Sequence, residues 1–372
     1  MLLTKQIHYG ELDERNMIIF GDNYQVCSEL LNDHKDKVKC IYIDPPYNNG
    51  ETFDHYRDDL AHDVWIDNMS KLIPPLFSLL HPNGSLWISI GDYELHYLKV
   101  ACDNAIGRDK YVATIIWQQR NTRENRKAFS NNHEYVLVYA KSPSKFKKTR
   151  NLLPPDSSVQ KRYVNPDNDP RGPWQSVTLN VQAGHAVESQ FYEIISPNGK
   201  RHYPPNGRCW IYNCDRMKKE IEAGNIWFGE HGNNVPRLKK FLYQSTLGVA
   251  PNTVWLSSEV GTSQSAKKQL LKMFPSLPPF GTPKPEELIQ RILTIATDPG
   301  DTVIDAYLGS GTTAAVAQKM RRCFIGIDNS TKSITYSVDR MNQVIAGDPS
   351  GISGSESWFG GGGFTLYNVS DQ

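Results

Sequence analysis

The sequence predicts an α/β fold in which a largely parallel sheet is interrupted by an inserted, loop-rich domain. Strand and helix patterns alternate over residues 1–150, and the alternation returns at Lys284. Residues 151–280, between them, are rich in Pro and Gly and have weak helical periodicity. Alternation of this kind is typical of parallel sheets covered by helices. We therefore expect residues 1–150 and 281–372 to form two halves of one domain around an insert at 151–280.

Apolar runs and helical periodicity locate the individual elements. Val38 to Ile43 is a run rich in β-branched residues that stops at an acid and two prolines, as a buried strand does. Strands are expected at 16–21, 38–43, 85–90, 111–117, 134–139, 302–304 and 323–327, and helices at 23–31, 63–80, 93–106, 285–296 and 312–320. The Gly- and Ser-rich stretch 347–363 is expected to be a flexible connection to a last edge strand at 364–367.

Composition excludes several classes of protein. No stretch approaches 18 apolar residues, so we expect no membrane span, and the first residues lack the long apolar region of a signal peptide. The six cysteines are scattered along the 372 residues, which favours a reduced, cytoplasmic protein. Cys209 and Cys214 lie near His202 and His231 in sequence. Their spacing matches no recognised zinc pattern, and we expect no metal site.

Charge is distributed unevenly along the chain. The formal net charge is only +1, yet residues 117–280 contain 24 Lys and Arg against 12 Asp and Glu, a net charge of +12. The remainder therefore carries −11. Aromatic residues, among them Trp117, Trp174, Trp210 and Trp255, are interleaved with the basic ones. This combination is typical of surfaces that bind nucleic acid, although a solvated run of charge is the alternative interpretation.

The tetrapeptide Asp44-Pro45-Pro46-Tyr47 directly follows the strand at 38–43. Proline fixes φ and has no N–H, so this loop is stiff. It presents a carboxylate, a backbone carbonyl and an aromatic ring, which are two hydrogen-bond acceptors and a stacking face. Such a set suits a planar amine like the exocyclic NH2 of a nucleobase. The alternative is a strand-terminating turn with a capping acid.

A glycine-rich turn follows a later strand. Gly309 and Gly311 permit a tight turn between that strand, which ends near Asp305, and the next helix. The following strand ends at Asp328, about 20 residues on, where an acid can accept the hydroxyl groups of a ribose. There is no Gly-Lys-Ser/Thr of a P-loop and no third glycine of a dinucleotide fingerprint. The pattern therefore favours a cofactor without a pyrophosphate, such as S-adenosylmethionine.

Together, the two motifs resemble those of the amino-group DNA methyltransferases. The Asp-Pro-Pro-Tyr loop precedes the cofactor loop, an order that resembles the β class, in which a target-recognition domain lies between them. Asn132 to Leu137 resembles the strand before that domain, and the motifs at 283–285 and 360–364 look like those of type III modification subunits. The resemblance covers 1–150 and 281–345. It implies a Rossmann-like, S-adenosylmethionine-dependent methyltransferase fold with circularly permuted motif order.

The resemblance also implies roles for individual residues. The implied catalytic residues are Asp44, Pro45, Pro46 and Tyr47. The implied cofactor-binding residues are Asp22, Asn23, Thr282, Lys284, Pro285, Asp305, Tyr307, Gly309, Ser310, Gly311, Thr312, Asp328 and Asn329. For Asp22, a plain helix cap is the alternative. The residues expected to contact DNA phosphates are Arg120, Arg123, Arg126 and Lys127. Double-stranded DNA is the implied substrate, and a second copy of the chain and a restriction subunit are implied partners.

Two positions depart from the family pattern. Ala306 stands where the cofactor loop usually has a proline, and Asp328 stands where Glu is common. The first change loosens the loop slightly, and the second shortens an acidic side chain by one methylene. We expect both to alter the affinity for the cofactor rather than to abolish activity.

The implied reaction is methyl transfer to N6 of adenine. Asp44 and the Pro45 carbonyl would accept the two amine hydrogens, and Tyr47 would stack on a base flipped out of the duplex. Three alternatives stay open. Enzymes that methylate N4 of cytosine more often begin this loop with Ser, and protein glutamine methyltransferases have Asn there and the opposite motif order. A catalytically silent DNA-binding subunit is the third.

Overall fold

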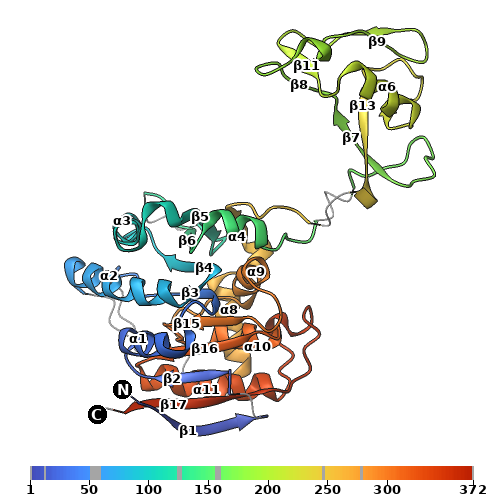
Figure 1. Cartoon of the computed structure of the whole chain (residues 1–372). Helices are drawn as coiled ribbons and strands as arrows, with labels where there is room; N and C mark the ends of the chain where they lie inside the picture. The colour runs from blue at the N-terminus through green and yellow to red at the C-terminus, as the bar shows by residue number, and fades with distance from the viewer. Residues whose placement is uncertain are drawn as a thin grey trace. The chain divides into compact units, whose positions relative to one another are not determined.

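The structure is a computed structural model that describes residues 2–11, 14–50, 60–123, 128–155, 161–244, 248–276 and 280–370. The chain divides into two compact units. The first, which we call the sheet unit, contains residues 1–151 and 251–372. The second, the small unit, contains residues 152–250. Figure 1 shows both units with their elements labelled.

The sheet unit is built on a mixed sheet. Within the described residues this sheet has ten strands in the order β1-β17-β2-β16-β15-β3-β4-β6-β5-β14. Neighbouring strands from β17 to β4 are parallel, and β1, β6 and β5 form antiparallel pairs. The strands are β1 (Leu2–Gly10), β2 (Met17–Phe20), β3 (Val38–Ile43), β4 (Leu80–Ile90), β5 (Tyr111–Gln118), β6 (His133–Ala140), β14 (Val254–Trp255), β15 (Thr302–Asp305), β16 (Cys323–Asp328) and β17 (Gly363–Ser370).

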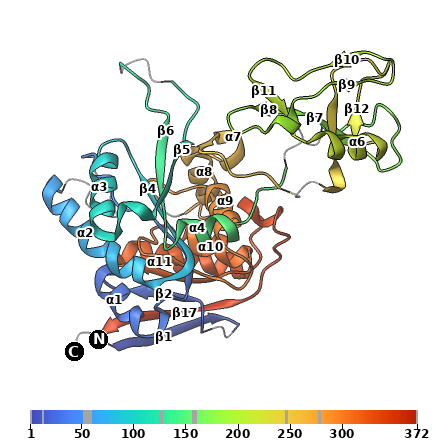
Figure 2. The ribbon, with the colours of Figure 1, turned by 45° about the horizontal axis from the view of Figure 1, so that its top comes forward.

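Helices cover both faces of the sheet. The described helices of this unit are α1 (Asn23–His34), α2 (His62–Leu79), α3 (Leu95–Ile106), α4 (Pro143–Thr149), α7 (Ser257–Val260), α8 (Ser263–Met273), α9 (Glu286–Ala296), α10 (Thr312–Lys319) and α11 (Thr331–Ile345), with short 3-10 turns η1 (Arg108–Lys110) and η4 (Gly351–Ser353). Helices α1, α2 and α3 pack side by side on one face, and α9, α10 and α11 on the other (Figures 1 and 2). Ile41 and Ile43 of β3 belong to the core under α1–α3, while Cys40 and Tyr42, which alternate with them along the strand, are also buried. The parallel strands are thus buried on both sides, and the expected α/β fold is confirmed.

The C-terminal part of the sheet unit differs from expectation. Strand β17 does not lie at the edge, because it pairs with β2 on one side and with β1 on the other. The preceding stretch is not a flexible connection either. Ile352 is buried, and Trp358 Nε1 donates a hydrogen bond to the Val344 carbonyl at 2.9 Å. Strand β1 and helix α11 were not predicted, because residues 2–10 lack a clear apolar alternation and α11 contains several Ser, Thr and Asn residues of low helix propensity.

The boundary of the insert also differs from the expected 151–280. The small unit ends at Ala250, and residues 251–280 pack with the sheet unit. Strand β14 extends the sheet beside β5, and the buried ring of Trp255 stacks on Trp87 with 6.3 Å between ring centroids. Helices α7 and α8 of this stretch were not predicted, because residues 151–280 as a whole have weak helical periodicity. The insert itself is therefore about thirty residues shorter than the sequence suggested.

The small unit is a compact arrangement of short strands. Its described elements are β7 (Trp174–Thr178), β8 (Asn180–Gln182), β9 (Ile194–Ile195), β10 (Arg201–His202), β11 (Arg208–Trp210), β12 (Ile226–Trp227), β13 (Arg237–Phe241), helix α6 (Cys214–Glu222) and the 3-10 turns η2 (Glu188–Gln190) and η3 (Leu242–Gln244). Leu179, Trp210 and Met217 lie in its apolar core. Lys239 is buried against Asp169 at 2.8 Å and also pairs with Asp167.

Two features of residues 117–280 differ from what their composition suggested. Trp117, Trp174, Trp210 and Trp255 are all at most 2% exposed, so these rings belong to the core and do not offer stacking faces to bases. The small unit has 12 Lys and Arg against 9 Asp and Glu, a net charge of only +3. Most of the positive charge of 117–280 therefore belongs to the sheet unit, at 117–151 and 251–280.

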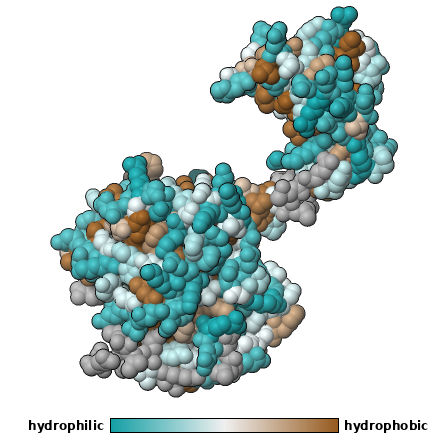
Figure 3. All heavy atoms as spheres, in the orientation of Figure 1, coloured by the Kyte–Doolittle hydropathy of each residue, from teal (hydrophilic) through white to brown (hydrophobic). Residues whose placement is uncertain are grey.

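One face of the molecule is drawn as a space-filling view in Figure 3. On the face drawn in Figure 3, hydrophilic residues dominate, and hydrophobic ones form small separate patches. None of the helices in the described parts of the chain is both long and apolar enough to span a bilayer.

Candidate active site

A cavity of about 1350 Å³ opens in the sheet unit where parallel strands end. Its walls come from the segments that follow β2, β3, β4, β15 and β16, at 22–24, 44–49, 91–93, 305–313 and 328–333. The carboxyl ends of parallel strands meet at one edge of a sheet, and open α/β folds bind ligands there. Both motifs singled out in the sequence therefore face the same cavity.

The Asp-Pro-Pro-Tyr loop begins where β3 ends. Its prolines have no N–H to continue the ladder, and the next residue, Asn48, has a left-handed φ of 53°. Two side chains fix the loop from outside. Trp65 Nε1 donates to the Pro46 carbonyl at 2.8 Å, and Asn48 Nδ2 donates to Glu94 at 2.8 Å. The loop is thus held in one position before any ligand arrives.

Asp44 pairs with a lysine that is distant in sequence. Lys284 Nζ donates to Asp44 Oδ2 at 2.8 Å, and the lysine is only 8% exposed. The other oxygen, Asp44 Oδ1, is buried and accepts no hydrogen bond from any residue that the structure describes. A buried acceptor without a donor is costly, so this oxygen is suited to receive a hydrogen bond from a ligand in the cavity.

Tyr47 and Glu134 complete a polar cluster around this lysine. The Tyr47 hydroxyl donates to Glu134 Oε2 at 2.9 Å, and Lys284 Nζ lies 3.7 Å from the same oxygen. The ammonium also lies 4.9 Å from the centre of the Tyr47 ring, which is within cation–π range. The absence of a side chain at Gly91 leaves room for this ring, since a Cβ there would lie 3.1 Å from it.

The cluster contains two carboxylates and one ammonium. Burial raises the pKa of the Glu134 carboxyl, and the neighbouring Asp44 raises it further, while Lys284 opposes both. Burial, helped by Asp44, also holds the pKa of the Tyr47 hydroxyl well above its ordinary value, so the phenol stays protonated and can donate. Lys284 therefore holds two acidic groups next to each other in a partly dry site.

Two acids order the glycine-rich turn at 305–313, which is the expected cofactor loop. Asp305 accepts hydrogen bonds from Thr313 Oγ1 at 2.6 Å and from the Tyr307 backbone at 3.0 Å. Asp328 at the end of β16 accepts from the backbone N–H of Gly309 at 2.9 Å and of Ser330 at 2.9 Å. Burial raises the pKa of Asp328 against these hydrogen bonds.

Gly309 and Gly311 of this loop are needed for different structural reasons. Both have a positive φ, 52° at Gly309 and 76° at Gly311. Gly309 lines the cavity, so its missing side chain leaves space for a ligand. A Cβ at Gly311 would lie 3.2 Å from Ser337 of α11, so this glycine allows the loop to pack on that helix.

The buried carboxyl of Asp305 is expected to make the free energy of unfolding depend on pH. Burial raises the pKa of its carboxyl to about 7, and the nearby Asp44 and Asp328 add to this, against its hydrogen bonds from Thr313 and Tyr307. The folded protein therefore binds this proton more tightly than the unfolded chain, and stability is lost as pH rises through 7. Relative to Asp305→Asn, we expect the wild type to lose about 3 kcal/mol of unfolding free energy from about pH 4.5 to about pH 7.5. Urea titrations of both proteins measure this, and parallel pH profiles would contradict it.

The cavity brings together most of the residues expected to act at it. Lining it are Asp22, Asn23, Asp44, Pro45, Pro46, Tyr47, Arg120, Thr282, Lys284, Asp305, Tyr307, Gly309, Ser310, Thr312, Asp328 and Asn329. Pro285 and Gly311 are not among its walls. Pro285 precedes α9 as its N-cap, and Asp22 caps α1 by accepting from the Gln25 backbone at 3.0 Å while also facing the cavity.

The structure describes two of the four residues that are expected to contact DNA. Arg120 lies in the wall of the cavity, where its Nε donates to the Asn131 carbonyl at 2.8 Å, and Arg123 is exposed. Arg126 and Lys127 lie outside the described residues. At the end of β5, residues 118–121 are held by α7 and α8, for example by Ser257 Oγ donating to Asn121 Oδ1 at 2.7 Å.

Sequence reasoning missed the role of Glu134 and Trp65. Glu134 was noted only as part of a strand motif, although a charged residue directly before the apolar run Tyr135 to Ala140 was a signal. Trp65 lies in a helix at a position where an apolar residue is expected, so nothing in the sequence pointed to its hydrogen bond with Pro46. Lys284 was assigned to the cofactor, and its pairing with Asp44 had no signal in the sequence.

Comparison with known proteins identifies the family. A model of the DNA methylase family matches residues 38–339, which is most of the chain. This chain belongs to the DNA methylase family. Its fold is accordingly the Rossmann-like methyltransferase fold, with the Asp-Pro-Pro-Tyr loop before the cofactor loop in sequence.

Several curated members of this family align with the chain. The StyLTI Mod subunit of a type III restriction-modification enzyme from Salmonella typhimurium is 30% identical over 81% of this chain and 49% of its own length. The probable HindVI Mod subunit from Haemophilus influenzae is 25% identical over 96% and 54%. The chain thus spans about half the length of these relatives. The type II methyltransferase M1.MboII from Moraxella bovis is 25% identical over 86% of the chain and 95% of its own length. Among solved structures, PvuII DNA methyltransferase aligns at 13% identity with a TM-score of 0.47, over 87% and 86%.

Proposed function

We propose that this DNA methylase transfers a methyl group from S-adenosylmethionine to N6 of an adenine in double-stranded DNA. The observation that carries the choice of chemistry is the Asp44 carboxylate, one oxygen of which is fixed by Lys284 while the other is buried and receives no hydrogen bond from the described residues. An exocyclic amine supplies the donor that this oxygen lacks. The same amine is the nucleophile when a methyl group is transferred to an amino group of DNA.

The residues around the cavity fit the proposed cofactor. Asp328 at the end of β16 offers a carboxylate to ribose hydroxyls, and the positive-φ Gly309 leaves backbone exposed where a side chain would stand. Asp22 and Asn23, which follow β2, line the same cavity. S-Adenosylmethionine, when bound, supplies an already electrophilic methyl group, so the protein need only hold and orient the nucleophile.

Asp44 and its loop orient that nucleophile. The lone pair of an aromatic amine is delocalised into the ring, and hydrogen bonds from its N–H groups to fixed acceptors favour a geometry in which the lone pair is available. The stiff Pro45-Pro46 segment, anchored by Trp65, keeps the acceptors in place. Tyr47 presents its ring to the cavity while Glu134 holds its hydroxyl, so its part is to stack on the base rather than to exchange a proton. The base has to leave the duplex to reach this loop, at a cost of a few kcal/mol.

Adenine is favoured over cytosine by the acid at position 44. Members of the family that act on N4 of cytosine more often have Ser there, and the carboxylate is the stronger acceptor. Type III Mod subunits among the relatives support the same choice. The chemistry at N4 of cytosine is otherwise the same, so the base itself has to be identified by experiment.

The DNA is expected to meet the basic part of the sheet unit. Arg120 stands in the cavity wall, Arg123 is exposed nearby in sequence, and residues 117–151 and 251–280 carry most of the excess positive charge. Contacts of this kind hold the phosphates and set the register, whereas base recognition falls to other side chains. A restriction subunit and a second copy of the chain are proposed partners, the first because type III Mod subunits are relatives.

A single incubation tests the proposal. The protein is mixed with DNA from a strain without methylases and with S-adenosylmethionine that carries a deuterated methyl group, and the digested nucleosides are analysed by mass spectrometry. We expect the label in N6-methyladenine. Label in N4-methylcytosine alone would overturn the choice of base. If no label appears and calorimetry detects no binding of S-adenosylmethionine, the protein is instead a silent DNA-binding subunit.

A further inference from the structure

A buried cluster of three charged residues lies beside the cofactor loop. Glu286, Lys319 and Arg340 have side chains that are at most 1% exposed. Lys319 Nζ lies 2.9 Å from one carboxylate oxygen of Glu286, and Arg340 Nη2 lies 2.9 Å from the other. Burial raises the pKa of Glu286, but the two cations outweigh it and hold that pKa below its ordinary value. Ionised groups are costly to bury, and apolar residues of the same volume are often as stable, so a cluster of this kind calls for a role in positioning.

Arg340 connects the cluster to the cofactor loop. Its Nη1 donates to Thr312 Oγ1 at 2.8 Å and to the Ser310 carbonyl at 3.3 Å. One turn earlier on the same face of α11, Ser337 Oγ donates to the Gly309 carbonyl at 2.8 Å. Helix α11 therefore holds the loop at three positions, each of which lines the cavity.

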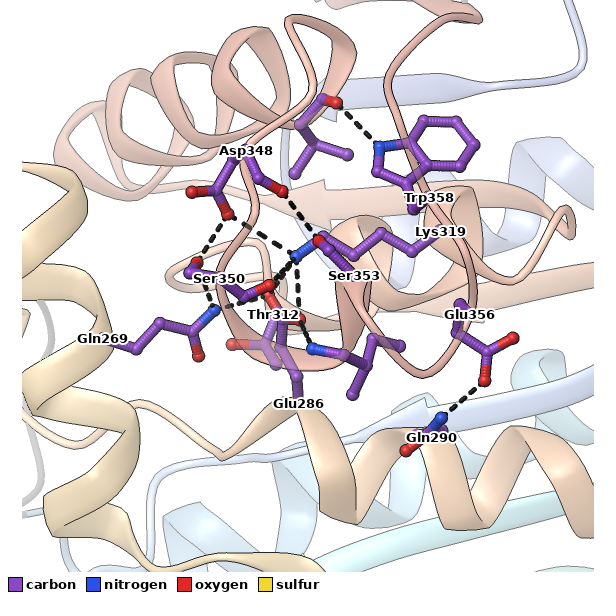
Figure 4. Close-up of polar contacts among 12 residues, drawn as sticks. Gln269, Glu286, Gln290, Thr312, Lys319, Asp348, Ser350, Ser353, Glu356 and Trp358 are labelled. Carbon is purple, nitrogen blue, oxygen red and sulfur yellow. Dashed lines mark hydrogen bonds and ion pairs between the residues drawn. The ribbon is translucent and has the colours of Figure 1, made fainter.

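A C-terminal segment closes the cluster from the other side. The Ile352 backbone N–H donates to Glu286 at 3.0 Å, and Lys319 donates to the Ser350 carbonyl at 2.9 Å. Figure 4 shows Glu286, Lys319 and Ser350 converging, with Gln269 from α8 reaching the same point. A Cβ on Gly351, which has a φ of 59°, would lie 2.1 Å from the Glu286 carboxylate. The segment 348–353 is thus in direct contact with the acid that holds Arg340.

We infer that Arg340 is a positioning residue for the cofactor loop, and that the segment 348–353 sets its position through Glu286. The inference rests on the proposed function, because it concerns the loop assigned to S-adenosylmethionine. A cluster with a purely structural role would not affect the affinity for S-adenosylmethionine specifically. Changes at Gly351, which does not line the cavity, alter the affinity for S-adenosylmethionine and leave the interaction with DNA unchanged.

Two glycines three residues apart give a matched test. Gly351→Ala forces a methyl group against Glu286, while Gly354→Ala places one in open space at a φ of −65°. We expect Gly351→Ala to raise the Kd for S-adenosylmethionine about tenfold or more, the loss of one or two hydrogen bonds to charged groups. Its KM for S-adenosylmethionine should rise in parallel, with KM for DNA unchanged. Gly354→Ala should behave as the wild type. Calorimetry and methyl-transfer kinetics measure these values.

Arg340 is tested directly by a second set of variants. Arg340→Met should weaken binding of S-adenosylmethionine at least as much as Gly351→Ala, and Arg340→Lys should recover part of the loss, since one ammonium cannot serve both Glu286 and Thr312. Arg322→Met is the matched control, because this half-buried arginine bonds Thr297 and not the cofactor loop. It should lower the melting temperature without changing the Kd.

The outcomes separate the inference from the function on which it rests. If the wild type binds S-adenosylmethionine and folded Gly351→Ala binds it with the same Kd, the inference is wrong. If Gly354→Ala or Arg322→Met weakens binding as much as Gly351→Ala, the effect is general destabilisation and the inference is likewise wrong. Failure of the wild type to bind S-adenosylmethionine at all overturns the proposed function instead.

Discussion

Replacing Asp44 with alanine is expected to lower the rate of methyl transfer about a hundred- to a thousandfold, the cost of removing one preorganised hydrogen-bonding group from a reaction centre. The reason is the geometry of its two oxygens. Oδ2 is held by Lys284 at 2.8 Å, so Oδ1 has a fixed direction and is the acceptor that orients the amine. A tritiated-methyl assay with saturating DNA and S-adenosylmethionine measures the rate.

Asp44→Asn is the informative companion to this variant. It keeps the shape of the side chain and one acceptor oxygen but removes the charge that pairs with Lys284. We expect an activity between those of the wild type and Asp44→Ala, with DNA binding close to that of the wild type in both variants. Turnover of Asp44→Ala at the wild-type rate would contradict the role given to this carboxylate.

Replacing Lys284 with methionine should have the second-largest effect. The lysine lies 2.8 Å from Asp44 and 3.7 Å from Glu134, and it is 8% exposed. Without it, two carboxylates share a mostly buried site, which costs about 3–5 kcal/mol when a buried pair is broken. We expect methyl transfer to fall about a hundredfold and the unfolding free energy to fall by a few kcal/mol, measured by the same assay and by urea titration.

The pH dependence of this variant distinguishes the electrostatic explanation from simple misfolding. The pKa of Glu134, already raised by burial, rises further once the ammonium is gone. A raised carboxyl pKa favours the folded state at low pH, so Lys284→Met should be less destabilised at about pH 5 than at about pH 8. Lys110→Met, which breaks a more exposed pair with Asp109, is the control and should change stability little at either pH. A loss of unfolding free energy that does not depend on pH would contradict the electrostatic explanation.

The central part of the fold follows from local sequence patterns. Strand β3 and the Asp-Pro-Pro-Tyr loop are adjacent in sequence, as are β15 and the cofactor loop, so each strand and the turn after it form one pattern. Both loops face one cavity because the carboxyl ends of neighbouring parallel strands meet at one edge of the sheet. Most strands and helices of 1–150 and 281–330 were accordingly predicted to within a few residues.

What could not be predicted depends on contacts between residues far apart in sequence. Lys284 pairs with Asp44 across 240 positions, and β17 gains its place inside the sheet only because the first residues of the chain pair with it. Arg340 reads as an ordinary charged residue in a helix that itself was not predicted. The tryptophans of 117–280 suggested a binding surface, but their burial depends on packing that composition does not reveal.

Methyl transfer to N6 of adenine is tested most directly by single-molecule sequencing of DNA from methylase-free cells that express this protein. We expect the kinetic signature of N6-methyladenine at one recurring sequence, and its absence from cells that express Asp44→Ala. The signature of N4-methylcytosine, or unmodified DNA in cells that contain the folded protein, would contradict it.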